Sequence, residues 1–85
     1  MSRGKKLNLG EVFDLLETCY GKQFYVRWSM IEKEKPIKEL DVVFAYKYIA
    51  EKPIVLRLFI HPNVTSDELF ETISCAVREE VKYVF

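Results

Sequence analysis

Apolar and polar side chains alternate along residues 40–62, as they do in β-strands whose successive side chains point to opposite faces. β-Branched and aromatic residues dominate this run, and Glu51-Lys52 interrupts it. The pattern predicts two long strands, over 40–50 and 53–62, joined by a tight connection. One face of this hairpin is apolar and carries Leu40, Val42, Phe44, Tyr46, Tyr48, Ala50, Ile54, Leu56, Leu58 and Ile60. Other elements have to cover that face, whereas the opposite face mixes apolar and basic side chains and need not be covered.

A helix is predicted over residues 9–20, where apolar side chains recur at helical spacing. Asn8 is a suitable N-cap, and Glu11 three positions later can complete a capping box. Gly21 suits the position just after a helix where the chain turns in the left-handed conformation. The apolar stripe of this helix consists of Leu9, Val12, Phe13, Leu16, Cys19 and Tyr20.

A second helix is predicted to begin after Thr65, which can act as N-cap and form a capping box with Glu68. Its apolar face consists of Leu69, Phe70, Ile73, Ala76, Val77, Val81 and Val84. Glu80 falls within this stripe. We expect its carboxylate either to lie at the rim of the core or to pair with a cation or a tyrosine hydroxyl.

Residues 22–31 also alternate and predict a first strand, which an exposed polar loop over 32–39 follows. This loop either only connects the strands or also contacts a partner. The order helix, strand, strand, strand, helix predicts an α+β fold: a three-stranded antiparallel meander with two helices packed on one face. We expect a disordered basic arm at 1–6 and a single α+β domain at 7–85.

The chain has 85 residues, of which 49% are hydrophobic, and this indicates one small packed domain. No apolar run approaches the roughly 20 residues that cross a bilayer, and no apolar signal segment follows the basic start. We therefore expect an intracellular protein, cytoplasmic or nuclear, without membrane contact. Cys19 and Cys75 are expected on different sides of the fold, as free thiols. Together with His61 they are too few ligands for a metal site.

The sequence lacks a recognisable set of catalytic residues. Its three glycines, Gly4, Gly10 and Gly21, do not form a phosphate-binding loop. His61 is the single histidine, precedes a proline and has no nucleophile at a recognisable spacing. We expect a non-catalytic protein with no cofactor and no small-molecule substrate.

The mixed face of the predicted sheet is the candidate binding surface, because cations and aromatic rings among small aliphatic side chains are typical of interface centres. Its candidate partner-binding residues are Tyr25, Arg27, Val43, Lys47, Ile49, Arg57 and Phe59. These residues predict a small interaction module of the adaptor, subunit or inhibitor type. The module would bind a protein partner or a second copy of itself, through this face or through a free strand edge.

Nucleic-acid binding is the alternative, with the basic and aromatic sheet face and the N-terminal arm contacting bases and phosphates. The net charge is zero, but Lys and Arg predominate in the arm and the strand region, and Asp and Glu in the helices. The element order resembles the double-stranded RNA-binding domain and the small Alu-binding subunits of the signal recognition particle, which implies RNA as a partner. The second helix of that domain starts with lysines, whereas residues 65–68 here are Thr-Ser-Asp-Glu, which would repel phosphate.

Overall fold

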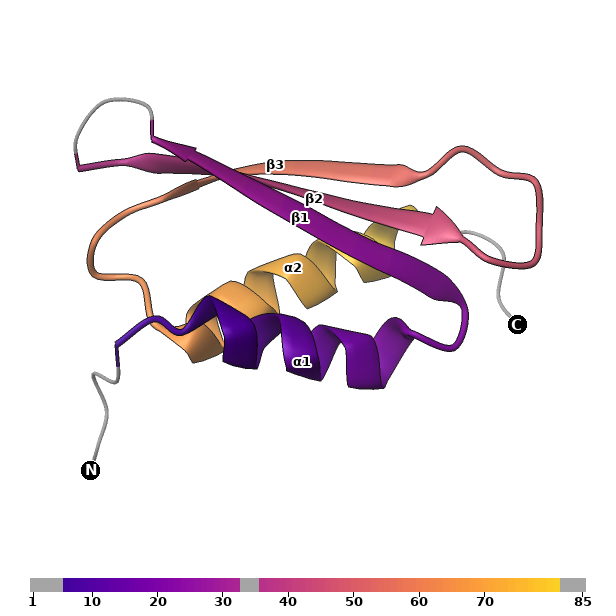
Figure 1. Ribbon diagram of the computed structural model, residues 1–85, viewed down its shortest axis with the longest axis horizontal. Coiled ribbons are helices and arrows are strands. Elements are labelled where there is room, and N and C mark those ends of the chain that lie inside the picture. The colour runs from indigo at the N-terminus through magenta and orange to yellow at the C-terminus, as the bar shows by residue number, and fades with distance from the viewer. Residues whose placement is uncertain (1–5, 33–35, 82–85) are drawn as a thin grey trace.

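The computed structural model describes residues 6–32 and 36–81, and it confirms the predicted α+β meander. Figure 1 shows its elements in chain order: α1 (Leu9–Tyr20), β1 (Phe24–Glu32), β2 (Lys38–Tyr46), β3 (Ile54–Ile60) and α2 (Ser66–Glu80). The strands lie in the order β1-β2-β3, and both neighbouring pairs are antiparallel. Apart from exposed Lys6, the predicted N-terminal arm lies outside the described residues, as does Val84.

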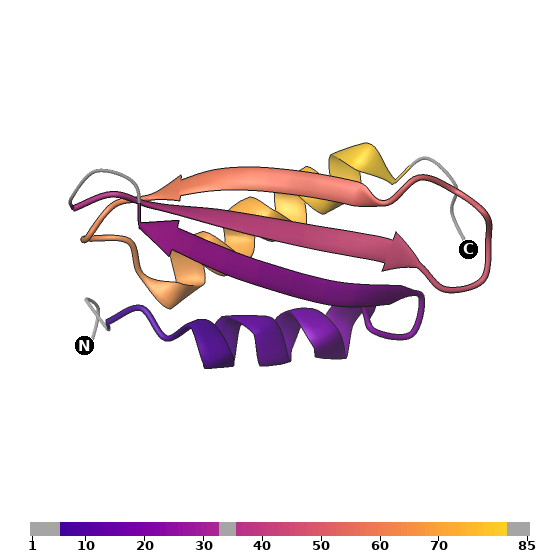
Figure 2. The same ribbon diagram turned by 45° about the horizontal axis from the view of Figure 1, so that its top comes forward.

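Both helices cover the same face of the sheet (Figures 1 and 2), with α1 in contact with β1 and α2 in contact with β3. The pairing register aligns Val26, Phe44 and Ile54 in one row across this face, so that each strand contributes to the core. The fully buried side chains with the largest volumes are Phe44, Leu16, Leu40, Ile73, Val12, Val42 and Val77. The core therefore lies between the sheet and the two helices.

The strand boundaries differ from the prediction in two places. The predicted tight connection at Glu51-Lys52 is wrong, because β2 ends at Tyr46 and β3 begins at Ile54, which leaves residues 47–53 as a longer connection. Tyr48 is 79% exposed and does not extend the apolar face. The predicted loop at 32–39 is too long, because Glu32 ends β1 and pairs with Lys38 at the start of β2. Opposite charges facing each other across two strands stabilise such a pair.

The structure confirms the predicted N-cap residues, Asn8 and Thr65, but only the second helix has a capping box. Thr65 and Glu68 form the predicted capping box of α2. Asn8 caps α1 by accepting a hydrogen bond from the Glu11 N–H at 3.2 Å. However, the Asn8 N–H donates to Ser66 Oγ in α2, at 2.8 Å, and so contacts the other helix instead of completing a box within α1.

Gly21 has right-handed backbone angles, φ −67° and ψ −17°, so the predicted left-handed conformation is wrong. The Gly21 N–H continues the helical pattern by donating to the Glu17 carbonyl at 2.8 Å. A Cβ atom at position 21 would collide with that carbonyl oxygen. Glycine is needed here for close backbone approach and not for a positive φ.

The apolar stripe of α1 is narrower than the sequence pattern indicates. Cys19, expected on this stripe, is exposed, whereas Val12, Phe13 and Leu16 are the buried side chains of the helix. Cys75 is also exposed, and both thiols are free. Glu80 is exposed and ends α2, which places its carboxylate at the rim of the core.

Ser74 is a buried hydroxyl without a partner among the described residues. Its side chain lies in α2 and is 4% exposed, and its Oγ has no hydrogen-bond partner there. Burying an unpaired polar atom costs free energy that an apolar side chain of the same shape does not cost. Ser74→Ala is therefore expected to raise the free energy of unfolding by about 1 kcal/mol.

Urea unfolding would test this expectation through a higher midpoint at an unchanged slope. Ser66→Ala is the matched control, since it removes the acceptor of the Asn8 N–H and should lower the midpoint. A lower midpoint for Ser74→Ala would show that its hydroxyl has a stabilising partner.

Candidate functional site

The face of the sheet opposite the helices is termed the open face (Figure 2). The register arranges its side chains in rows that run across the strands. In order along the sheet, the rows are Ile31-Glu39-Phe59, Ser29-Asp41-Arg57, Arg27-Val43-Val55 and Tyr25-Ala45. Four large apolar side chains of these rows are between 51% and 60% exposed: Tyr25, Ile31, Val55 and Phe59. The open face therefore presents apolar surface from both of its edge strands, β1 and β3.

The structure brings six of the seven sequence-predicted site residues together on this face. Five of them lie within the strands: Tyr25, Arg27, Val43, Arg57 and Phe59. Lys47 directly follows β2, and its N–H donates to the Gln23 carbonyl, which prolongs the pairing with β1. Ile49 is different, because it lies in the 47–53 connection beyond the paired strands.

A cluster of three charged side chains lies toward one end of the open face, in its first two rows. The Arg57 guanidinium Nε lies 3.0 Å from a Glu39 carboxylate oxygen and 3.4 Å from an Asp41 carboxylate oxygen. The Glu39 side chain is only 7% exposed, while that of Arg57 is 65% exposed. Two carboxylates and one guanidinium leave this cluster with a formal charge of −1. The cluster explains how the Glu39 carboxylate can be buried, since the Arg57 cation pairs with it at 3.0 Å.

Glu39 and Asp41 were not among the predicted site residues. The sequence pattern assigns Glu39 to the polar loop, because residues 32–39 are mostly charged and include a proline. A usable signal exists nonetheless: Glu39 and Asp41 are two positions apart, and strand alternation puts such residues on the same face. What the sequence does not show is that Arg57, from the next strand, lies directly opposite Asp41.

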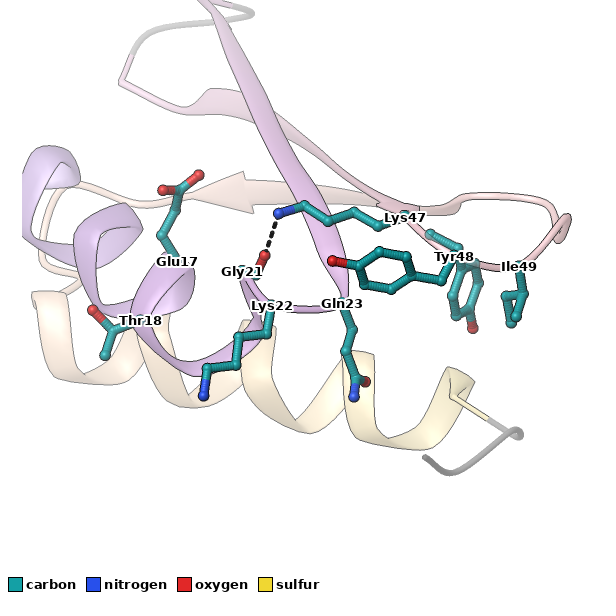
Figure 3. A pocket seen from close by; sticks show the side chains of 9 residues that line it. Glu17, Thr18, Gly21, Lys22, Gln23, Lys47, Tyr48 and Ile49 are labelled. Carbon is teal, nitrogen blue, oxygen red and sulfur yellow. Dashed lines mark hydrogen bonds between the residues drawn. The ribbon is translucent and has the colours of Figure 1, made fainter.

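Lys47 joins the open face to the end of α1 (Figure 3). Its ammonium donates a hydrogen bond of 2.6 Å to the Gly21 carbonyl. The same ammonium lies 4.9 Å from the centre of the Tyr25 ring, within the range of a cation–π interaction. A positive charge at the C-terminal end of a helix also interacts favourably with the helix dipole. Lys47 therefore holds α1, β1 and the end of β2 in a fixed relation.

A surface cleft of about 790 Å³ lies beside this contact. It is lined by Glu17, Thr18, Gly21, Lys22, Gln23, Tyr46, Lys47, Tyr48 and Ile49. Figure 3 shows the Lys22 and Gln23 side chains directed away from the Lys47 ammonium. Small-molecule sites have a few polar groups that converge on the ligand. The cationic groups of this cleft do not converge in that way.

Residues 6–32 and 36–81 contain neither a metal-binding cluster nor a membrane-spanning helix. No group of three or more His, Cys, Asp or Glu side chains there is placed to hold a metal ion. Neither helix in this part of the chain has the length and apolar character needed to cross a membrane.

Comparisons of the chain with protein-family models, with curated proteins and with solved structures found no match.

Replacing Lys47 with methionine tests whether this lysine is a structural residue. Lys47→Met keeps the apolar stem but removes the bond to Gly21 and the contact with Tyr25. We expect the free energy of unfolding to fall by about 1–2 kcal/mol. Thermal or chemical unfolding followed by circular dichroism measures this change.

Lys22→Met is the matched control, because Lys22 lines the same cleft but is exposed. Its effect should stay within about 0.5 kcal/mol, as for most surface substitutions. Equal losses for the two variants would mean that the Lys47 contacts contribute nothing specific.

Proposed function

We propose that this chain is a small non-catalytic interaction module that binds a protein partner through the open face of its sheet. The observation that carries the proposal is the combination of four half-exposed apolar side chains with an ion cluster on one face. Exposed apolar area gathered in this way is typical of protein-binding surfaces. Arg57 adds a directional contact, and arginine is enriched where interfaces carry most of their binding energy. The module would act as an adaptor, a subunit or an inhibitor.

The distribution of charge supports a protein partner over a nucleic acid. Two carboxylates hold Arg57, and a backbone carbonyl holds Lys47. Arg27 is the open-face cation for which the described residues supply no such partner. Nucleic-acid surfaces need several cations free to neutralise phosphates, and carboxylates among them repel phosphate. Glu39 and Asp41 therefore favour a partner with mixed apolar and polar surface.

The free edges of the sheet offer a second way of contacting the same partner. β1 and β3 each have one side without a neighbouring strand in the described sheet. An extended segment of a partner can add to such an edge by backbone hydrogen bonds. Contact with β3 in this mode would also border Val55 and Phe59, which continue the open face to that edge.

The double change V55K/F59K tests the proposal, because it places two cations where a protein interface needs apolar surface. The immobilised chain and this variant would be used as baits in a lysate of the native host. The proteins retained would then be purified and titrated against each chain by calorimetry. We expect at least a tenfold loss of affinity for the variant, which corresponds to about 1.4 kcal/mol.

Leu15→Lys is the matched control, since Leu15 is 49% exposed but lies on α1, away from the open face. A partner bound through the open face should tolerate this change. Partners that bind V55K/F59K as well as the unaltered chain would contradict the proposal.

The same variant separates the protein partner from the RNA alternative. Added cations should strengthen binding to a single-stranded RNA oligonucleotide, measured by fluorescence anisotropy, while they weaken binding to a protein. If the unaltered chain binds this RNA at about 50 mM salt, with affinity that falls steeply as salt rises, the partner is a nucleic acid and the proposal of a protein partner is wrong.

A further inference from the structure

The free edge of β3 presents backbone hydrogen-bonding groups. The Lys47 N–H bonds to the carbonyl of Gln23 directly across from it, and such bonded pairs recur at every second residue of antiparallel strands. Odd-numbered residues of β2 therefore bond to β1, and even-numbered residues bond to β3. The same alternation turns the N–H and C=O groups of Val55, Arg57 and Phe59 away from β2. No strand of the described chain pairs with this edge.

Helix α2 extends under the place that a fourth strand at this edge would take. The helix lies on the covered face of the sheet and contacts β3. Figure 2 shows its C-terminal end, in yellow, emerging beyond β3 on the side away from β2. A strand added to β3 would therefore have α2 on its covered side and solvent on its open-face side.

The corner between β3 and α2 also holds a small pocket that is mainly apolar. Its volume is about 120 Å³, and its lining includes Leu58, Val64, Glu68, Leu69 and Thr72. An apolar cavity of about 150 Å³ can hold a benzene molecule. The pocket therefore has room for one aliphatic side chain.

The corresponding corner at β1, the other free edge, is filled by an aromatic pair. Trp28 of β1 stacks on Phe13 of α1, with the ring centres 4.9 Å apart and the ring planes 4° from parallel. Phe13 is itself buried. A strand added at β1 would find the space between sheet and helix occupied there, whereas at β3 a pocket is open. This difference favours β3 as the edge that receives a strand.

The helix beside the pocket is acidic. One carboxylate oxygen of Glu68 accepts the Thr65 N–H at 3.2 Å, and the Glu68 side chain is exposed. Glu79 follows about three helical turns later and so lies on the same side of α2. Arg78 is the one basic residue of this helix, against five acidic ones. Lysine or arginine in a bound segment would therefore be attracted to α2.

We infer that the partner contributes an extended segment that adds to β3 as a fourth antiparallel strand, with an aliphatic side chain in the pocket and basic side chains beside α2. This inference rests on the proposed function, because it specifies how the protein partner is held at the edge of the open face. Antiparallel addition continues the existing sheet and pairs slightly more stably than parallel addition.

The register of such a strand follows from the alternation. Residues that face each other across antiparallel strands point to the same side of the sheet. The segment residue opposite Leu58 therefore enters the pocket. Its two neighbours, opposite Arg57 and Phe59, exchange backbone hydrogen bonds with β3 and turn their side chains toward the open face.

A short peptide tests this mode directly. Thr-Lys-Val-Leu-Val-Lys-Thr, labelled with fluorescein through a flexible linker, has leucine for the pocket, lysines on the same side and valines on the other. We expect fluorescence anisotropy to give a dissociation constant below about 1 mM. Saturating peptide should slow hydrogen exchange of the Val55, Arg57 and Phe59 amides at least tenfold. The amides of Val26 and Trp28, which face the free edge of β1, should be unchanged.

Methylation of peptide nitrogens separates strand addition from side-chain contact alone. The nitrogens of the two valines face β3 in the inferred register, so methyl groups there should weaken binding at least tenfold. The nitrogens of the two lysines face away from β3, and methyl groups there should be tolerated. Equal affinities for the two methylated peptides would contradict antiparallel addition.

A charge reversal at the pocket tests the place of the peptide. Thr72→Lys puts a cation beside the pocket at an exposed position and should weaken binding of the peptide at least tenfold. A peptide with glutamates in place of both lysines should instead bind this variant better than it binds the unaltered chain. Thr18→Lys is the matched control, because Thr18 is an exposed threonine of α1. Circular dichroism has to show that both variants fold.

The outcomes separate this inference from the proposed function. No peptide binding at about 1 mM, or protection of the β1 amides instead, overturns addition to β3. The bait experiment with V55K/F59K then still decides whether a protein uses the open face. Protected β3 amides together with a weaker Thr72→Lys variant support the inference. If the partner recovered from the lysate tolerates V55K/F59K but not Thr72→Lys, the edge is the binding site and the open face is not.

Discussion

The structure depends on the burial of one face of its central strand. Leu40, Val42 and Phe44 of β2 are completely buried, and each stabilises the fold by about 1.5–3 kcal/mol. Because β2 has a strand on either side, only elements above or below the sheet can cover these side chains. Both helices are used for this purpose on the same face. The described chain has no third layer, and the opposite face is therefore left to solvent or to a partner.

Local sequence patterns are sufficient for much of this architecture. The limits of α1 follow from an N-cap at Asn8 and from apolar spacing, and the start of α2 follows from the capping box of Thr65 and Glu68. These interactions join residues three or four positions apart, so they can be read directly along the chain. The division of the strands into a covered and an open face follows in the same way from alternation.

Features that depend on contacts between distant residues could not be predicted in this way. The alternation of Tyr46, Tyr48 and Ala50 continues past the end of β2 and conceals where the strand stops. That end coincides with the bond from Lys47 to Gly21, 26 positions away. The same alternation places Ile49 on the candidate surface, although it lies in the connection. Similarly, Glu39 is buried beside Arg57 of the next strand, and no neighbour in the sequence indicates that contact.

The hydrogen bond between Asn8 and Ser66 joins the first turns of both helices, which are 58 positions apart. An odd number of strands separates the helices, so they run in the same direction side by side (Figure 2). Closing so long a loop costs conformational entropy that only the finished sheet and both helices together can offset. The pairing of α1 with α2 is thus among the most non-local contacts of the fold, and contacts of this kind slow folding. During synthesis, α1 has to wait until all three strands have been made before α2 exists.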